Sequence, residues 1–121
     1  MPSVTALPDF DQKRRHFRLR YPKRARPVIR FDDQYFHVNE LSEGGIRVEM
    51  RHPEVYFRGM TVSGRLRMKG GTSIEVEGEV LRIEGNELVI KLLAGPSFKD
   101  MMQQQGFVRR HYPLYFSNGQ E

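Results

Sequence analysis

Apolar and polar residues alternate along the middle of the chain with a period of two, which is typical of β-strands with one buried and one solvated face. The alternation predicts six short strands, at residues 28–31, 34–41, 46–50, 61–68, 74–83 and 88–93. Asp32-Asp33 and Lys69-Gly70-Gly71-Thr72 are predicted to be tight turns between neighbouring strands. Leu81 and Ile83 shift the alternation by one position, which predicts a β-bulge. Six short strands joined by tight turns predict an all-β protein built on a small antiparallel barrel.

One helix is predicted after the last strand. Ser97 is a suitable N-cap, because its hydroxyl oxygen can accept a hydrogen bond from a backbone N–H of the first turn. Gly106 is expected to end the helix, since glycine is the commonest residue just beyond a helix C-terminus. The apolar residues that share one helix face are Phe98, Met101 and Met102. We expect this face to pack against the barrel as part of the core.

A length of 121 residues predicts a single domain. We expect residues 1–11 to be a flexible leader, residues 12–106 to hold the barrel with its helix, and residues 107–121 to be a C-terminal tail. The sequence has no cysteine, which excludes disulfide bonds and thiolate chemistry. It also has no apolar run of the length that a signal peptide or a membrane helix needs. We therefore expect a cytoplasmic protein without membrane insertion.

Basic residues are concentrated near the amino end. The formal net charge is +5, and nine of the 20 Lys and Arg residues lie between residues 12 and 30, where there is no Asp or Glu. An unpaired guanidinium is costly to bury, so this stretch must either stay in water or meet an anion. Pro22 and Pro27 exclude a long helix there. Residues 12–26 are therefore predicted to form a flexible, extended basic arm.

Two short motifs give the basic arm a specific interpretation. The first is Arg14-Arg15-His16-Phe17-Arg18, and the second is Glu40-Leu41-Ser42-Glu43-Gly44-Gly45. Together with the six strands and the helix, they resemble the PilZ domain family, whose members carry R-x-x-x-R followed by D/N-x-S-x-x-G. Arg14 and Arg18 match the first pattern, and Ser42 and Gly45 match the second. The resemblance covers residues 12–105, which is most of the chain.

This resemblance implies a six-stranded PilZ-type barrel and a non-catalytic receptor for cyclic di-GMP, a bacterial second messenger. The chemistry is suitable, because a guanidinium can bind guanine O6 and N7 bidentately, stack on a purine and pair with a phosphate. A small hydroxyl and adjacent glycines would let the ligand lie close to the backbone. The ligand-binding residues implied by the resemblance are Arg14, Arg15, Arg18, Glu40, Ser42, Gly44 and Gly45. No cofactor is implied, and a downstream protein would receive the signal.

Glu40 departs from the family pattern, which has Asp or Asn at this position. The carboxylate can still accept hydrogen bonds from guanine N1–H and N2–H₂, but its stem is one methylene longer and loses more rotamer entropy. Asn39 has suitable chemistry one residue earlier, and a one-residue step along a strand is expected to turn its side chain to the opposite face.

Two other functions are compatible with the sequence. A basic barrel could bind single-stranded nucleic acid by base stacking, with Tyr35, Phe36, Tyr56 and Phe57 as the stacking residues. We rank this below cyclic di-GMP. A ligand-free PilZ-like interaction module is the second alternative, and Glu40 keeps it open. The four histidines lack metal-ligand spacing, and neither a G-x-S-x-G nor a Walker A motif is present, so we expect neither a metal site nor an enzyme.

Overall fold

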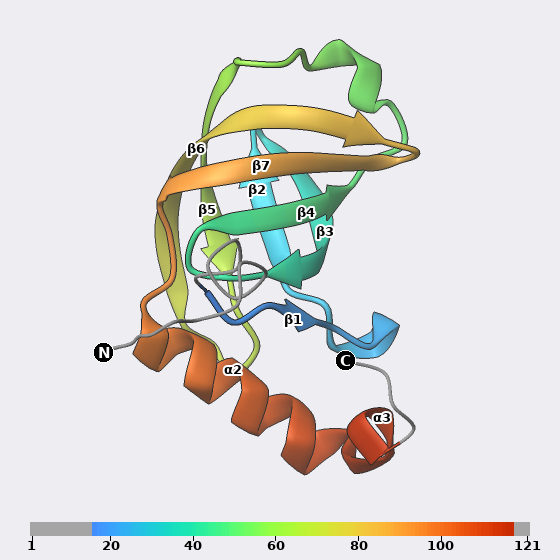
Figure 1. Cartoon of the computed structure of the whole chain (residues 1–121), viewed down its shortest axis with the longest axis vertical. Coiled ribbons are helices and arrows are strands. Elements are labelled where there is room, and N and C mark those ends of the chain that lie inside the picture. Colours follow the sequence, from blue (N-terminus) through green and yellow to red (C-terminus); the bar gives the residue numbers. More distant parts are fainter. Residues whose placement is uncertain (1–15, 118–121) are drawn as a thin grey trace, which may run out of the picture.

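The computed structural model describes residues 16–117, and Figure 1 shows a barrel with a helix lying below it. The strands of the barrel are β2 (Val28–Phe31), β3 (Gln34–Leu41), β4 (Gly45–Glu49), β5 (Thr61–Arg67), β6 (Ser73–Glu84) and β7 (Glu87–Ala94). They follow the order β3-β2-β5-β6-β7-β4, and β4 pairs back with β3. Every pairing is antiparallel. The predicted six-stranded antiparallel barrel is therefore confirmed.

The turns have the backbone conformation that their residues favour. Asp32 and Asp33 take φ values of 48° and 65°, and Gly70 and Gly71 take 93° and 99°. In the two-residue Asp32-Asp33 turn, positive φ at both residues matches the twist of antiparallel strands, and Asp and Gly tolerate positive φ better than most other residues do. The predicted bulge in β6 is also confirmed, because the pairing with β7 shifts between Val80 and Arg82.

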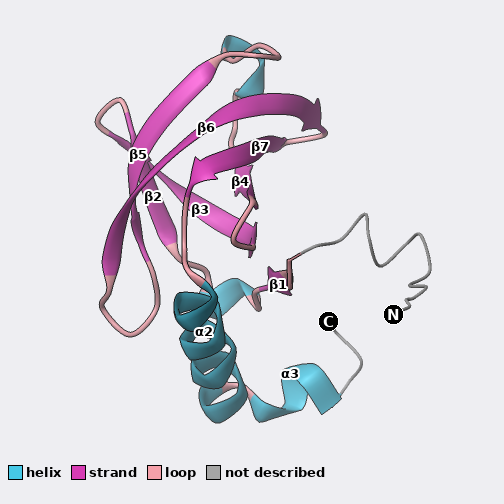
Figure 2. Cartoon of the chain, turned by 60° about the vertical axis from the view of Figure 1, so that its left-hand side comes forward, coloured by secondary structure: helices cyan, strands magenta, loops and turns pink. Residues whose placement is uncertain are grey.

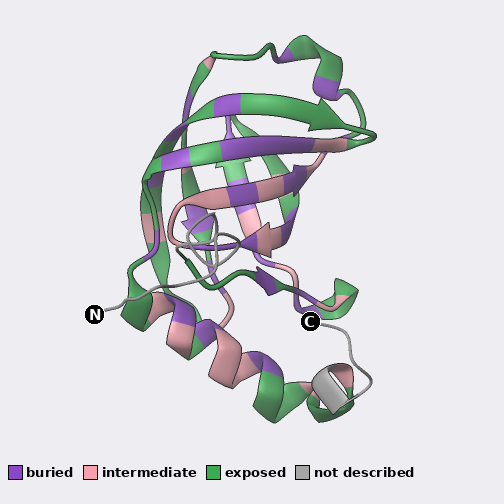
Figure 3. Ribbon diagram, viewed as in Figure 1, coloured by how far each residue is buried: buried purple, intermediate pink, exposed green. Residues whose placement is uncertain are grey.

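Buried and exposed residues alternate along the strands (Figure 3), which places every second side chain in the interior of the barrel. Its fully buried residues include Ile29, Val38, Leu41, Ile46, Val48, Leu66, Val80, Leu88 and Ile90. A short 3₁₀ turn, η2 (Pro53–Val55), lies in the connection between β4 and β5.

The stretch between residues 19 and 25 is docked on the barrel, which differs from the flexible arm expected there. β1 (Leu19–Arg20) pairs with the end of β3, and η1 (Lys23–Ala25) is a 3₁₀ turn. Leu19 and Ala25 are completely buried and Tyr21 is 5% exposed. These apolar residues alternate with basic ones, so the stretch buries one side while its charges stay in water. Residues 12–15 of the arm and the expected leader, residues 1–11, lie outside the described residues.

The helix α2 (Phe98–His111) begins as predicted and ends later than predicted. The Ser97 Oγ accepts from the Asp100 N–H at 3.0 Å, and the Asp100 carboxylate accepts from the Ser97 N–H at 2.9 Å. The helix then passes through Gly106, because burial of Val108 outweighs the roughly 1 kcal/mol that glycine costs within a helix. Phe98 is 61% exposed, so only part of the expected apolar face is core. A short helix α3 (Pro113–Ser117), which was not predicted, follows α2 (Figure 2).

A buried hydrogen-bond network ties the amino-terminal stretch to α2. The Tyr21 hydroxyl donates to Gln104 Oε1 at 2.8 Å, and Gln104 Nε2 donates to the Lys69 carbonyl at 2.6 Å. The Lys69 N–H donates to the same Gln104 Oε1 at 3.2 Å. Burial raises the pKa of the Tyr21 phenol, which keeps it a neutral donor. Gln104 therefore joins the amino-terminal stretch, α2 and the β5–β6 hairpin.

Replacing Gln104 with leucine is expected to lower the free energy of unfolding by about 2 kcal/mol, because the buried Tyr21 hydroxyl and the partly buried Lys69 backbone groups lose their partner. Gln103→Leu is the matched control, since Gln103 is exposed on the same helix. Urea unfolding of both variants checks this. Equal stability of the two variants would show that the network does not stabilise the fold.

Candidate functional site

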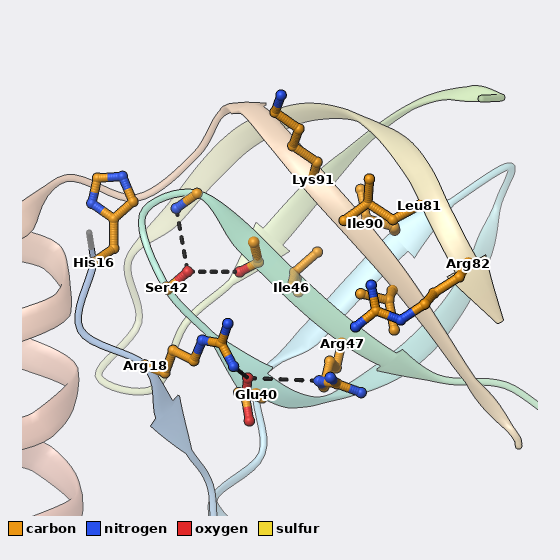
Figure 4. Close-up of a pocket in the computed structure, with 13 residues that line it drawn as sticks. His16, Arg18, Glu40, Ser42, Ile46, Arg47, Leu81, Arg82, Ile90 and Lys91 are labelled. Atoms are coloured by element: carbon orange, nitrogen blue, oxygen red, sulfur yellow. Dashed lines mark hydrogen bonds and ion pairs between the residues drawn. The ribbon is translucent and has the colours of Figure 1, made fainter. Parts of the chain in front are cut away.

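A cavity of about 320 Å³ opens on the outer surface of the barrel, over β4, β6, β7 and the end of β3 (Figure 4). Five of the seven predicted site residues line it: Arg18, Glu40, Ser42, Gly44 and Gly45. The other lining residues are His16, Ile46, Arg47, Leu81, Arg82, Val89, Ile90 and Lys91. The two remaining predicted site residues, Arg14 and Arg15, lie outside the described residues.

Residues 42–45, which we name the glycine corner, join β3 to β4. The Ser42 N–H donates to the Gly45 carbonyl at 2.9 Å, and the Gly44 N–H donates to Ser42 Oγ at 3.3 Å. The Leu92 N–H donates to the Gly44 carbonyl at 2.9 Å, which fixes the corner to β7. Ser42 therefore shapes the corner in addition to lining the cavity.

The two glycines of the corner are constrained differently. Neither takes a positive φ, so the backbone conformation does not require glycine. A Cβ at Gly44 would lie 3.0 Å from His16 Cδ2, which is a tight contact. A Cβ at Gly45 would lie 3.6 Å from the Ile90 carbonyl oxygen and 3.7 Å from Ser42 Oγ, which are ordinary contacts. Within residues 16–117, neither backbone nor packing therefore demands glycine at 45, and the missing side chain only leaves the cavity open.

Glu40 is surrounded by three guanidinium groups, and we name these four side chains the Glu40 cluster. Its Oε1 lies 3.5 Å from Arg20 Nη1. Its Oε2 lies 3.6 Å from Arg47 Nε and 4.0 Å from Arg18 Nη1. The Glu40 side chain is 19% exposed, whereas Arg18 and Arg20 are about half exposed. Both carboxylate oxygens are thus engaged by arginines at the edge of the cavity.

The prediction that the side chains of Asn39 and Glu40 point to opposite faces of the strand is wrong, because β3 contains a bulge. Pairing with β4 passes from Val38–Val48 directly to Glu40–Arg47, which leaves Asn39 as the extra residue. Asn39 contacts Glu87, with its Nδ2 donating to a carboxylate oxygen at 2.7 Å, and Glu87 also contacts Arg20. Both side chains therefore lie on the outer face of the barrel, where Asn39 is covered by its partners, and only Glu40 lines the cavity.

Arg47 and Arg82 were not predicted as site residues, and both are paired with acidic groups. Arg47 Nη1 lies 2.7 Å from Glu84 and 3.2 Å from Glu87, and Arg82 Nε contacts Glu84. Hydrogen bonds from these two arginines lower the pKa of Glu84 to about 2, and the bond from Arg47 has the larger effect. The hydrogen bond that Arg47 donates to Glu84 in turn raises the pKa of Arg47. Both arginines are therefore already neutralised by carboxylates before any ligand enters.

Lys91 was also missed, and it differs from the other cations of the cavity. It is exposed on β7, directly across from Gly45, and it makes no ion pair with any residue in the described part of the chain. Period-two alternation from Gly45 could have identified Arg47 as a neighbour on the same face. Arg82 and Lys91 could be identified as neighbours of the glycine corner only once the pairing of the strands was known.

The four aromatic residues suggested for nucleic-acid stacking do not form one surface. Tyr56 is only 8% exposed, and Phe36 packs against the core. Tyr35 is 70% exposed, but it lines a different cavity, together with Arg30, Arg65 and Arg67 among others. Phe36 and Tyr56 line a third cavity. This division disfavours the stacking platform on which the nucleic-acid alternative depends.

Two further findings bear on function. Between residues 16 and 117, no group of three or more His, Asp or Glu side chains could hold a metal ion. Over the same part of the chain, no helix combines the length and the apolar character needed to cross a membrane.

Comparison with known proteins identifies the class. The sequence profile of the PilZ domain matches residues 12–111, and the chain therefore belongs to the PilZ domain family. No curated protein matches the chain.

Three solved structures have a similar fold. MotI/DgrA, an inhibitor of motility from Bacillus subtilis, is 18% identical with a TM-score of 0.64, over 83% of this chain and 51% of that one. YcgR from Escherichia coli, solved in complex with c-di-GMP, is 17% identical with a TM-score of 0.57, over 88% of this chain and 49% of that one. The Legionella protein Lpg0364 is 18% identical with a TM-score of 0.51, over 78% of this chain and 91% of that one. At these identities the likeness concerns the fold alone, and this chain spans about half the length of MotI and YcgR.

Proposed function

We propose that this chain is a non-catalytic receptor that binds cyclic di-GMP over the glycine corner. The observation that carries this proposal is that the two motifs, which are separate in the sequence, meet at one cavity. Arg18 represents the first motif there, and Glu40, Ser42, Gly44 and Gly45 represent the second. Membership of the PilZ domain family and the YcgR complex support the identity of the ligand.

The roles of the residues follow from the chemistry of the ligand, which carries two guanines and two phosphates. Arg14, Arg15 and Arg18 supply guanidinium groups that bind guanine edges bidentately, stack on purine faces and pair with phosphates. Glu40 accepts from guanine N–H groups at the cavity edge.

The glycine corner forms the floor of the site. Since no contact among the described residues requires glycine at 45, the open space there is best explained by a ligand that approaches the backbone. The planar guanine bases of cyclic di-GMP can lie against such a surface, and the Ser42 hydroxyl lines the same cavity.

Signalling would proceed by closure of residues 12–18 over the bound ligand, which changes the surface presented to a downstream protein. β1 continues into Tyr21, which is hydrogen-bonded to Gln104 of α2. A shift of the amino-terminal stretch therefore has a direct physical connection to the helix, and the arrangement fits a ligand-driven switch.

Calorimetric titrations with cyclic di-GMP, cyclic di-AMP and a short single-stranded oligonucleotide test this function. We expect saturable binding of cyclic di-GMP and much weaker binding of cyclic di-AMP, because adenine has N6–H₂ where guanine presents the O6 acceptor. Preference for the oligonucleotide, with a steep salt dependence, would support the nucleic-acid alternative. Absence of binding to all three ligands would support a ligand-free interaction module.

Lys91→Ala is expected to weaken binding of cyclic di-GMP about tenfold. Lys91 is the cavity cation without a carboxylate partner among the described residues, and a charge-assisted hydrogen bond contributes about 1.5–3 kcal/mol. Lys99→Ala is the matched control, since Lys99 is exposed on α2 and does not line the cavity. Equal affinity of the two variants for cyclic di-GMP in calorimetry would exclude a charge-assisted hydrogen bond between Lys91 and a phosphate of the ligand.

A further inference from the structure

The Glu40 cluster joins the amino-terminal stretch to the barrel through one carboxylate. Arg18 and Arg20 approach Glu40 from the stretch that contains β1, and Arg47 approaches it from β4. Figure 4 shows Arg18 and Arg47 on either side of the Glu40 carboxylate. Because Arg18 is also a proposed ligand contact, the same guanidinium has two competing partners.

The three arginines differ in how firmly they are held. Arg47 is 19% exposed and also bound to Glu84 and Glu87, so it cannot leave without breaking several contacts. Arg20 has a second partner in Glu87, at 3.4 Å. Arg18 is 45% exposed, and in the described structure Glu40, at 4.0 Å, is its only ion-pair partner. Arg18 is therefore the member of the cluster that can exchange.

The length of the Glu40 side chain decides whether this competition occurs. An aspartate on the same backbone would carry its carboxylate one methylene closer to β3 and farther from Arg18, whose contact already lies at the limit of an ion pair. It would still present two oxygens to guanine N–H groups.

We propose, building on the function proposed above, that the extra methylene of Glu40 makes this carboxylate an internal competitor that holds Arg18 in the absence of cyclic di-GMP and lowers affinity for it. The ion pair between Arg18 and Glu40 must break before Arg18 can contact the ligand. Exposed ion pairs are individually weak, and each is equivalent to at most about a fivefold change in an equilibrium constant. The competitor therefore tunes affinity and does not abolish binding.

Glu40→Asp tests this inference by calorimetry with cyclic di-GMP. It keeps the charge and the acceptor oxygens but withdraws them from Arg18, so affinity is expected to rise by up to about fivefold. Glu75→Asp is the control, because it shortens by one methylene a carboxylate that also pairs with an exposed arginine, Arg65, but lies outside the cavity. It should leave the affinity for cyclic di-GMP unchanged. Equal or weaker binding by Glu40→Asp relative to the unmodified protein would overturn the inference.

A measurement on the free protein separates this inference from the proposed function. NMR relaxation of the Arg18 Nε–H group is expected to show greater mobility in Glu40→Asp than in the unmodified protein. If neither protein binds cyclic di-GMP, the proposed function is wrong, and so is any effect of Glu40 on affinity. Equal Arg18 mobility in the two proteins would show that Glu40 does not hold Arg18, whether or not the ligand binds.

Discussion

Replacing Arg18 with alanine is expected to remove most of the thermal stabilisation that cyclic di-GMP gives this protein. A bidentate guanidinium–guanine contact is equivalent to about 1–3 kcal/mol, which corresponds to a loss of affinity of up to about a hundredfold. Ligand at 100 times the dissociation constant stabilises a protein by about 2.7 kcal/mol, and a hundredfold weaker site gains only about 0.4 kcal/mol. Thermal denaturation with and without ligand measures this difference. Arg14→Ala is expected to behave in the same way.

The free Arg18→Ala protein is expected to melt almost where the unmodified protein does. The Arg18 side chain is 45% exposed and its ion pair with Glu40 spans 4.0 Å, so its loss changes the free energy of unfolding by less than about 1 kcal/mol. Arg24→Ala is the control, because Arg24 is exposed and does not line the cavity. If Arg18→Ala and Arg14→Ala both respond to ligand as Arg24→Ala does, the arginine motif is not the binding site.

Replacing Gly45 with leucine is expected to abolish binding of cyclic di-GMP without destabilising the fold. The new side chain would start from a Cβ with only ordinary contacts and would occupy the cavity. Glycine within a strand is destabilising by about 0.5–1 kcal/mol, so the free energy of unfolding should stay the same or rise slightly. Calorimetry and urea unfolding of the same sample measure the two effects, which have opposite signs.

Ser63→Leu is a suitable comparison for Gly45→Leu, since Ser63 is an exposed position of β5 outside the cavity. It should leave binding unchanged. Retention of binding by Gly45→Leu would mean that the ligand does not lie over the glycine corner.

The period-two pattern was sufficient for the barrel, because each strand has one buried and one solvated face. Leu19 and Tyr21 show the same pattern, but the surrounding arginines and prolines favoured a flexible arm. The docking of this stretch on the barrel was therefore not predicted. The end of α2 was missed for another reason. Gly106 is a stop signal only when nothing beyond it is buried, and burial of Val108 is a tertiary effect that the local sequence does not show.

The candidate site was predictable only as far as its motifs extend. The resemblance to the PilZ motifs named Arg18, Glu40, Ser42, Gly44 and Gly45 as site residues, and the structure brings these five residues to one cavity. The extra residue at Asn39 changes which side chains share a face, and a bulge has no clear signature in this strand. The ion pairs of Arg47 and Arg82 join different strands, so they depend on a register that the sequence alone does not give.

A structure of the protein saturated with cyclic di-GMP, determined by crystallography or by intermolecular NMR contacts, tests the central claim most directly. We predict that the guanidinium groups of Arg14, Arg15 and Arg18 contact the dinucleotide while it lies against Gly44 and Gly45. A saturated complex in which these guanidinium groups lie far from the glycine corner would contradict the account.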